Sequence, residues 1–213
     1  MTVARPSSVG RLVLRTFLWL APCFAAWYLG ARYLVPFVGA LARAFVELFI
    51  SGLVSGVERQ GLDLVFVTTV EVHVAARQVG LLLVEVNPLL YSYGLPLFVA
   101  LMLAARAEWW KILAGVAVLL PFQAWGIAFD FLAEIVRSGA DISARAGLLG
   151  LRAELVALGY QVGSLIFPAL VPVALWVAFN RRLVDGVIRS PAPGMRSPAG
   201  NVRWRTDPPD DAA

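Results

Sequence analysis

Four long apolar runs constrain the fold of this chain more than any other feature. A helix needs about 20 residues to cross the hydrocarbon core of a bilayer, and each run is close to that length. The runs are Val13 to Leu34, Pro88 to Ala105, Ile112 to Leu132 and Leu158 to Phe179. The first is too long for a signal-peptide core, so we expect an uncleaved anchor. The pattern predicts a mainly α integral membrane protein with about four transmembrane helices.

The composition supports this fold class and limits the chemistry. Apolar residues make up 60% of the chain and charged residues 15%, whereas a soluble domain is about one quarter charged. No basic patch with interleaved aromatic residues is visible, so we expect no nucleic-acid partner. The chain has one Cys and one His, which excludes an intrachain disulfide and leaves no cluster with metal-ligand spacing. We therefore expect no cofactor and no metal.

The basic residues fall unevenly on the two sides that alternating spans define. Eleven of the 18 Lys and Arg residues lie near the N-terminus, between residues 106 and 111, or after Asn180. Because Lys and Arg are enriched in cytoplasmic segments, both termini are expected in the cytoplasm.

The expected spans divide the chain into nine segments. Residues 1–12, 106–111 and 180–213 are expected to be cytoplasmic, the last as a disordered basic tail. Residues 13–34, 88–105, 112–132 and 158–179 are the expected transmembrane helices. Residues 35–87 and 133–157 are expected outside the cytoplasm, and the second of these two segments has a helical pattern with basic residues among leucines and alanines.

Residues 35–87 are predicted to form an amphipathic helix and a small β-hairpin. Pro36 to Leu53 has apolar residues at helical spacing, namely Phe37, Leu41, Phe45, Leu48 and Phe49, and Gly52 and Gly56 are expected to end it. Leu62 to Ala75 alternates like a strand, followed by a turn at Arg77 to Gly80 and a return strand from Gly80 to Val86. One strand face is Leu64, Phe66, Thr68, Val70, Val72 and Val74, and the other is Val65, Val67, Thr69, Glu71 and His73. A lone hairpin is marginally stable in water, so it must pack on the helix, the membrane surface or a partner.

The segment Glu85 to Pro96 is unusual because polar and helix-breaking residues interrupt the start of a span. Such groups are tolerated at membrane depth only where protein or water satisfies the backbone. Asn87 is a good helix cap and Pro88 fits a first helical turn, so part of the segment is helix initiation. The rest predicts a packing or docking surface. The candidate interaction or packing site is Glu85, Asn87, Tyr91, Tyr93, Gln123, Trp125, Asp130 and Gln161.

Two interpretations of the carboxylates remain open. Glu85 and Asp130 are both expected near the outer interface, where two close carboxylates could share a proton and act as an acid and a base. Alternatively, Asp130 ends a helix at the water boundary and Glu85 pairs with Arg59 or Arg77.

The remaining polar residues fit structural roles better than catalytic ones. Cys23 lies midway along the first span and His73 in the outer hairpin, so they are not expected to form a nucleophile pair. Gln123 and Gln161 are expected to make interhelical hydrogen bonds.

Several short motifs resemble the exosortase H-associated membrane proteins. They are Glu85-Val86-Asn87-Pro88-Leu89-Leu90-Tyr91-Ser92-Tyr93-Gly94-Leu95-Pro96, Gln123-Ala124-Trp125-Gly126 with Phe129-Asp130, Leu158-Gly159-Tyr160-Gln161-Val162-Gly163 with Pro168 and Pro172, and Trp19-Leu20-Ala21-Pro22-Cys23-Phe24. The resemblance implies a bacterial inner-membrane protein that accompanies exosortase H, a membrane cysteine transpeptidase thought to process proteins with a C-terminal sorting tail. The chain lacks the outer Cys, Arg and His arrangement of exosortases, so it resembles a companion and not the protease.

Two functions follow from these observations. The favoured one is a non-catalytic accessory or assembly subunit that contacts the sorting enzyme or its substrate on the outer side, with membrane lipid as its surroundings. The alternative is a membrane enzyme or small-solute carrier that uses Glu85 and Asp130 around a polar pocket.

Overall fold

The structure is a computed structural model, and it describes residues 8–75, 78–181 and 185. Most of these residues are helical, and three strands form one small antiparallel sheet. The elements are α1 (Ser8–Phe49), β1 (Val54–Gln60), β2 (Asp63–Ala75), β3 (Gln78–Val86), α2 (Leu89–Ser92), α3 (Gly94–Ala104), α4 (Trp109–Arg137), α5 (Ala140–Arg145), α6 (Leu151–Gln161), the π-helical turn η1 (Val162–Ile166) and α7 (Phe167–Phe179). The expected tail after Asn180 lies almost entirely outside the described residues.

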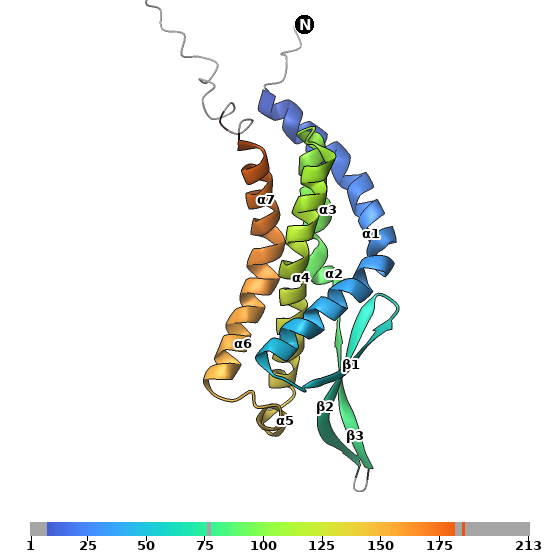
Figure 1. Cartoon of the computed structure of the whole chain (residues 1–213), viewed down its shortest axis with the longest axis vertical. Helices are drawn as coiled ribbons and strands as arrows, with labels where there is room; N and C mark the ends of the chain where they lie inside the picture. The colour runs from blue at the N-terminus through green and yellow to red at the C-terminus, as the bar shows by residue number, and fades with distance from the viewer. Residues whose placement is uncertain (1–7, 76–77, 182–184, 186–213) are drawn as a thin grey trace, which may run out of the picture.

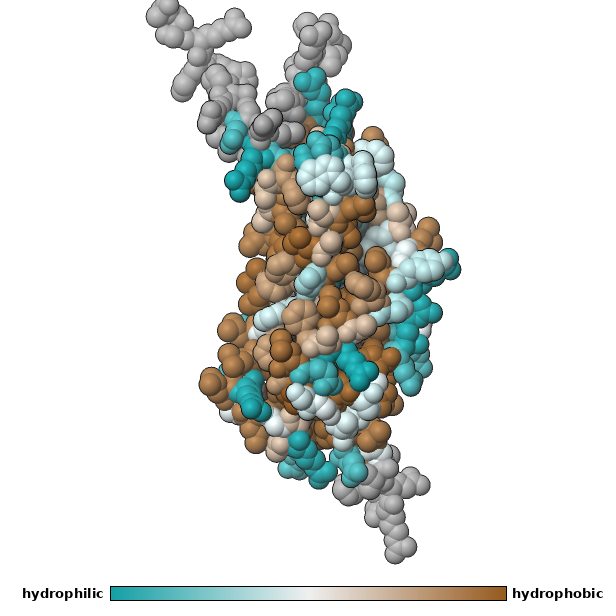
Figure 2. Space-filling model, viewed as in Figure 1, coloured by the Kyte–Doolittle hydropathy of each residue, from teal (hydrophilic) through white to brown (hydrophobic). Residues whose placement is uncertain are grey.

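Three helical segments are long and apolar enough to cross a membrane. They are Gly10–Phe49, Trp109–Arg137 and the continuous helix Leu151–Phe179. The predicted second span is a shorter apolar segment, Leu89–Ala104, which is about 24 Å long at 1.5 Å per residue against a hydrocarbon core of about 30 Å. The structure therefore confirms three of the four expected spans by length and composition. Figure 2 shows the apolar surface that covers the middle of the molecule between two polar ends.

The path of the chain explains the role of the short segment (Figure 1). α1 runs from one end of the molecule to the other, where the sheet and α5 lie, and we call these the terminal end and the sheet end. α2 and α3 return the chain to the terminal end, α4 runs back, and α6, η1 and α7 return it again. The start of α1 and the end of α7 thus lie at the same end.

A hydrogen bond from β1 compensates for the helical hydrogen bond that a proline removes from α1. Pro36 has no backbone N–H, so the carbonyl of Arg32, four residues earlier, loses its helical partner. The guanidinium of Arg59 in β1 donates a hydrogen bond to that carbonyl at 2.7 Å. Figure 1 shows that α1 changes direction along its length before it passes beside the sheet. The first strand therefore stabilises the helix at the point where proline weakens it.

The second half of α1 is the expected amphipathic helix, but its buried face differs from the prediction. The helix ends at Phe49 before Gly52, and Gly56 lies in β1. The buried residues are Val35, Val38, Gly39, Ala42 and Val46, whereas the bulkier Phe37, Leu48 and Phe49 are exposed. Small side chains let the sheet approach: a methyl group at Gly39 would lie 2.9 Å from Cδ2 of Leu64. Close packing thus selects small residues, which a search for bulky apolar residues overlooks.

The predicted hairpin is two strands of a three-stranded sheet. β2 lies between β1 and β3 and pairs with both in antiparallel register. The expected turn at Arg77 to Gly80 is wrong because β3 already begins at Gln78; Arg77 itself lies outside the described residues. β1 was missed because its second half, Glu58 to Gln60, is polar and exposed and the strand is irregular between Val54 and Gly56.

The predicted strand face is the face that packs against the helices. Leu64, Phe66, Thr68 and Val70 of β2 are all buried. The Phe66 ring stacks on Phe131 of α4, with ring centroids 4.6 Å apart. The Thr68 hydroxyl donates to the backbone oxygen of Leu82 in β3 at 2.9 Å, so its burial leaves no unmatched donor. The sheet is thus part of the main core and not a separate hairpin.

The helices at the sheet end extend beyond the expected spans. α4 continues to Arg137, so Asp130 lies inside the helix and does not end it, which corrects one of the two interpretations given above. α5 and the start of α6 occupy the predicted second outer loop. The fourth span begins at Leu151 and contains the π-helical turn η1 immediately before Phe167 and Pro168. Because Pro168 cannot donate a helical hydrogen bond, it locally favours such a rearranged turn.

Candidate functional site

The segment that joins β3 to α2 is a helix start, as predicted. The side-chain oxygen of Asn87 accepts a hydrogen bond from the backbone N–H of Leu89 at 2.9 Å. The N–H of Tyr91 donates to the carbonyl of Pro88 at 3.2 Å. Pro88 itself is buried. The Asn-Pro pair therefore turns the chain from the sheet into the helix bundle.

Glycine residues bring three elements into contact directly after this turn. A methyl group at Gly126 of α4 would lie 2.4 Å from Cδ1 of Tyr91 in α2. A methyl group at Gly163 of η1 would lie 2.9 Å from the Gly126 Cα atom. No real Cβ atom sits that close to a ring or a backbone atom, so only glycine fits at position 126 without a shift. α2, α4 and η1 therefore meet at one point.

A similar contact holds α3 against α7. A methyl group at Gly94 would lie 2.5 Å from the carbonyl oxygen of Pro168. Pro172, four residues later, cannot supply the N–H that would normally bond that carbonyl. The Gly94 backbone thus covers a carbonyl that proline leaves without a helical partner. The break between α2 and α3 places Gly94 in this position.

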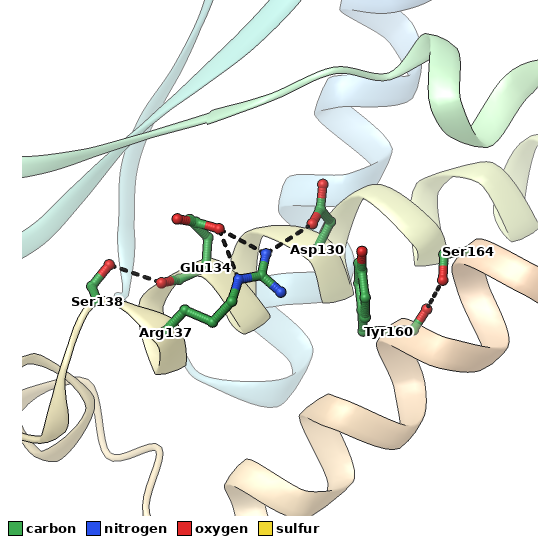
Figure 3. A network of polar contacts seen from close by, with 6 residues as sticks. All are labelled: Asp130, Glu134, Arg137, Ser138, Tyr160 and Ser164. Atoms are coloured by element: carbon green, nitrogen blue, oxygen red, sulfur yellow. Dashed lines mark hydrogen bonds and ion pairs between the residues drawn. The ribbon is translucent and has the colours of Figure 1, made fainter.

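A polar network surrounds the contact between α2, α4 and α6 (Figure 3). Asp130, Glu134 and Arg137 lie four and three residues apart on one face of α4. Nη2 of Arg137 lies 2.7 Å from Glu134 Oε2 and 3.4 Å from Asp130 Oδ1. The Arg137 guanidinium also lies over the ring of Tyr160 in α6, 5.3 Å from its centroid. The hydroxyl of Tyr91 interacts with the Asp130 carboxylate. The network therefore links α4 to α6 next to the point where the glycines bring α2, α4 and η1 together.

The members of this network differ in solvent exposure. The side chain of Asp130 is 17% exposed, whereas those of Glu134 and Arg137 are 48% and 49% exposed. An exposed ion pair contributes about 0–1 kcal/mol, so the Glu134–Arg137 contact adds little. Asp130 is different, because burying a carboxylate without a partner is unfavourable. Arg137 and Tyr91 are the groups that permit its burial.

Trp125 belongs to an aromatic cluster one turn away. Its ring stacks on Phe129 at 4.5 Å, and the edges of Phe45 and Phe49 in α1 and of Phe167 in α7 approach it. Its indole N–H donates to the carbonyl of Gly159 in α6 at 3.2 Å. Trp125, which is half-buried, therefore joins α4 to α1, α6 and α7.

The remaining candidate residues do not join the network. Glu85 and Asn87 are exposed at the end of β3, and Tyr93 is 37% exposed. In the described part of the chain, no ion pair links Glu85 to Arg59. Glu85 is exposed on the sheet, whereas Asp130 is largely buried and pairs with Arg137, so the two carboxylates lie in different surroundings.

The two glutamines also differ from their prediction. Gln123 is buried and lines two small cavities of about 10 Å³ each, which is room for about one water molecule. Gln161 is exposed on α6. Within residues 8–75, 78–181 and 185, neither side chain makes an interhelical hydrogen bond.

Sequence reasoning missed Glu134, Arg137 and Tyr160. A signal was present, because Asp130, Glu134 and Arg137 recur every three or four residues and so share one helix face. It was missed because the span was expected to end at Leu132. The glycines of the short motifs carry the second signal, since each lies in close contact with a ring or a backbone atom of a neighbouring element.

The arrangement can hold helices together. Cys23 is buried in α1, and His73 lies in β2, on a different element. The polar groups at the junction satisfy one another, which is what a structural network requires. These features define a polytopic membrane protein. Close contacts at glycines and a partly buried ion pair hold its helices together.

The chain belongs to the family of exosortase H-associated membrane proteins. The family model matches residues 6–183, which confirms the resemblance and covers every described element. No curated protein and no solved structure matches the chain significantly.

Proposed function

We propose that the protein is a non-catalytic accessory or assembly subunit of a bacterial exosortase-type sorting system, which contacts the sorting enzyme or its substrate on the outer side of the inner membrane. Membership of a family described as exosortase H-associated is the observation that carries this proposal. An accessory subunit needs a surface that a partner can contact, and the structure at the start of α2 limits where that surface can lie. Most of the segment from Pro88 to Pro96 is buried within the chain, so it positions the sheet and does not itself offer a large surface.

The surface best suited to a partner is the outer face of β3. Leu81, Leu83, Glu85 and Asn87 alternate with buried residues and are all exposed; we call them the β3 stripe. Leu81 is 49% exposed and Leu83 is 59% exposed. β3 is also an edge strand, since it pairs with β2 alone. An exposed apolar edge strand is a site where another chain can add a strand or pack a side chain.

The proposed orientation places the sheet end outside the cytoplasm and both termini inside it. The Lys and Arg distribution supports this, as does the return of α7 to the end where α1 starts (Figure 1). Leu89–Ala104 then acts as the fourth crossing. The test uses Cys23→Ser and adds Glu58→Cys in β1 or Glu108→Cys before α4, both exposed positions. A membrane-impermeant maleimide should label Glu58→Cys in whole cells and label Glu108→Cys only after lysis; the reverse pattern would refute the orientation.

Co-purification tests the function. The tagged full chain is expressed with the exosortase from the same genome and isolated in mild detergent. We expect the two proteins to elute together, and we expect Leu83→Arg to reduce the recovered exosortase severalfold at equal protein level. Leu149→Arg is the control, because Leu149 is 55% exposed but lies between α5 and α6. Elution of the chain alone, together with normal sorting in a deletion strain, would refute the proposal.

Conservative substitutions at the two carboxylates distinguish the accessory role from the alternative role as an enzyme or carrier. Under the accessory role, Glu85→Gln should retain sorting, and any loss with Asp130→Asn should follow the amount of folded protein. Loss of sorting at normal protein level in both variants would favour the alternative.

A further inference from the structure

An apolar groove lies between α1 and α3. It has a volume of about 500 Å³ and is lined almost entirely by carbon, with Trp19, Cys23 and Trp27 on α1 and Leu95, Val99 and Leu103 on α3. α1 and α3 lie side by side in this part of the molecule (Figure 1). On α1 the lining runs from Trp19 to Leu34, which is about 22 Å at 1.5 Å per residue.

The dimensions distinguish a lipid chain from a helix. A volume of about 500 Å³ spread over about 22 Å gives a cross-section on the order of 20 Å². Carbon atoms of neighbouring chains approach to about 4 Å, so one hydrocarbon chain needs roughly that cross-section. A helix with side chains is about 10 Å wide and needs roughly four times as much. The groove is also longer than half of a hydrocarbon core of about 30 Å, the depth that one acyl chain occupies.

Positive charge lies at the terminal end of this groove. Arg15 precedes Trp19 by four residues and therefore lies on the same face of α1, one turn nearer the helix start. Arg106 follows Leu103 in the turn between α3 and α4. Both arginines are exposed, and neither makes an ion pair within the described residues. Nearby Lys111 differs, because Glu108 binds it at 3.3 Å.

We propose that this groove binds one anionic phospholipid, with an acyl chain between α1 and α3 and the phosphate headgroup at Arg15 and Arg106. The apolar lining excludes water from the acyl chain, and the two guanidinium groups complement the headgroup charge. The site lies at the opposite end of the molecule from the β3 stripe (Figure 1).

The test uses the full chain in phosphatidylcholine nanodiscs with a trace of phosphatidylglycerol that carries a diazirine on its acyl chain. After irradiation, mass spectrometry should find the label on peptides of α1 and α3. A basic residue near a membrane surface contributes about 1 kcal/mol to binding of an anionic lipid, so Arg15→Gln and Arg106→Gln should each lower labelling about fivefold. Arg181→Gln is the control, because it removes an exposed charge beyond α7 that does not line the groove.

A second pair of variants tests the groove itself. Ala26 lines the groove and its neighbour Ala25 does not, and both are exposed, so neither substitution overfills a core. We expect Ala26→Phe to reduce labelling severalfold and Ala25→Phe to leave it unchanged. Equal labelling by a phosphatidylcholine probe, label spread evenly onto α7, or full labelling of the arginine variants would overturn the proposal. If Ala26→Phe fails to fold, the arginine variants decide the question alone.

Discussion

α1 and α4 are both long apolar helices, yet they relate to the rest of the molecule in different ways. Of the most apolar 18-residue window of α4, 44% is buried inside the protein, whereas none of the corresponding window of α1 is buried. α4 contacts the sheet, α1, α6 and α7, and it carries Gly115 and Gly126 at close contacts. Hydropathy does not distinguish the central α4 from the peripheral first half of α1, whereas glycines at close contacts do: Gly115 and Gly126 have near neighbours and Gly30 has none. α4 is the scaffold, and the first half of α1 faces lipid.

The largest difference in stability is expected when one glycine of each helix is replaced by alanine. Gly126→Ala forces Cβ to within 2.4 Å of the Tyr91 ring, and overpacking of this kind costs about 1–3 kcal/mol. Gly30→Ala in α1 meets nothing within 4 Å, so it should be neutral or stabilise the helix by about 0.5–1 kcal/mol. Thermal unfolding in detergent measures both. Similar behaviour of the two variants would remove the distinction between scaffold and periphery.

The next effect concerns the polar network on α4. Asp130→Asn and Arg137→Gln should each destabilise the protein, and a double-mutant cycle should give a coupling free energy of about 0.5–1 kcal/mol, limited by the solvent exposure of Arg137. The exposed pair Glu108 and Lys111 is the control and should show no measurable coupling. A coupling for Asp130 and Arg137 that is equally undetectable would mean that the network does not stabilise the junction.

A smaller effect tests the bend of α1. Arg59→Gln should destabilise the protein by about 0.5–1.5 kcal/mol, because the Arg32 carbonyl loses its donor. In a Pro36→Ala background the helix regains an N–H for that carbonyl, so the same change at Arg59 should matter less. Chemical denaturation of the four proteins measures this. Equal effects in both backgrounds would show that Arg59 does not compensate for the proline.

The smallest effect is a pH dependence at the start of α4. Hydrogen bonds from the indole of Trp110 and from Lys111 hold the pKa of Glu108 below its ordinary value. The charged form is therefore favoured in the folded state, and its contribution is present at neutral pH and lost as pH falls through the lowered pKa. Because Glu108 is fully exposed, the melting temperature of Glu108→Gln should differ from that of the parent only slightly at pH 7, and this difference should shrink as the pH falls through the lowered pKa. A difference that grows toward acid would contradict this sign.

The sequence carried enough information for the parts of the fold that rest on long patterns. Three spans, the core face of β2 and the start of α2 at Asn87 and Pro88 follow from hydropathy, alternation and capping. The buried face of α1 did not follow, because packing against β2 selected Gly39 and Ala42 over larger residues. β1 did not follow either, since its polar residues form a strand only with β2 beside them.

Only part of the candidate site could be predicted from the sequence, and the reason is related. Tyr91 of α2 lies next to α4, which carries Trp125 and Asp130. The partners of these residues, however, come from distant segments of the chain. Tyr160 reaches the network only because Gly159 and Gly163 let α6 and η1 approach α4. Such contacts depend on how helices pack, which local patterns do not encode.

Site-specific photocrosslinking at the β3 stripe is the most direct test of the accessory role. A photoreactive amino acid at Leu83 and, as control, at Leu170, a lipid-facing residue of α7 that is 60% exposed, is incorporated in cells that contain the exosortase. The account predicts a crosslink to the exosortase or its sorting substrate from position 83 and none from position 170. Crosslinks from position 170 alone, or from neither position at normal expression of both proteins, would contradict it.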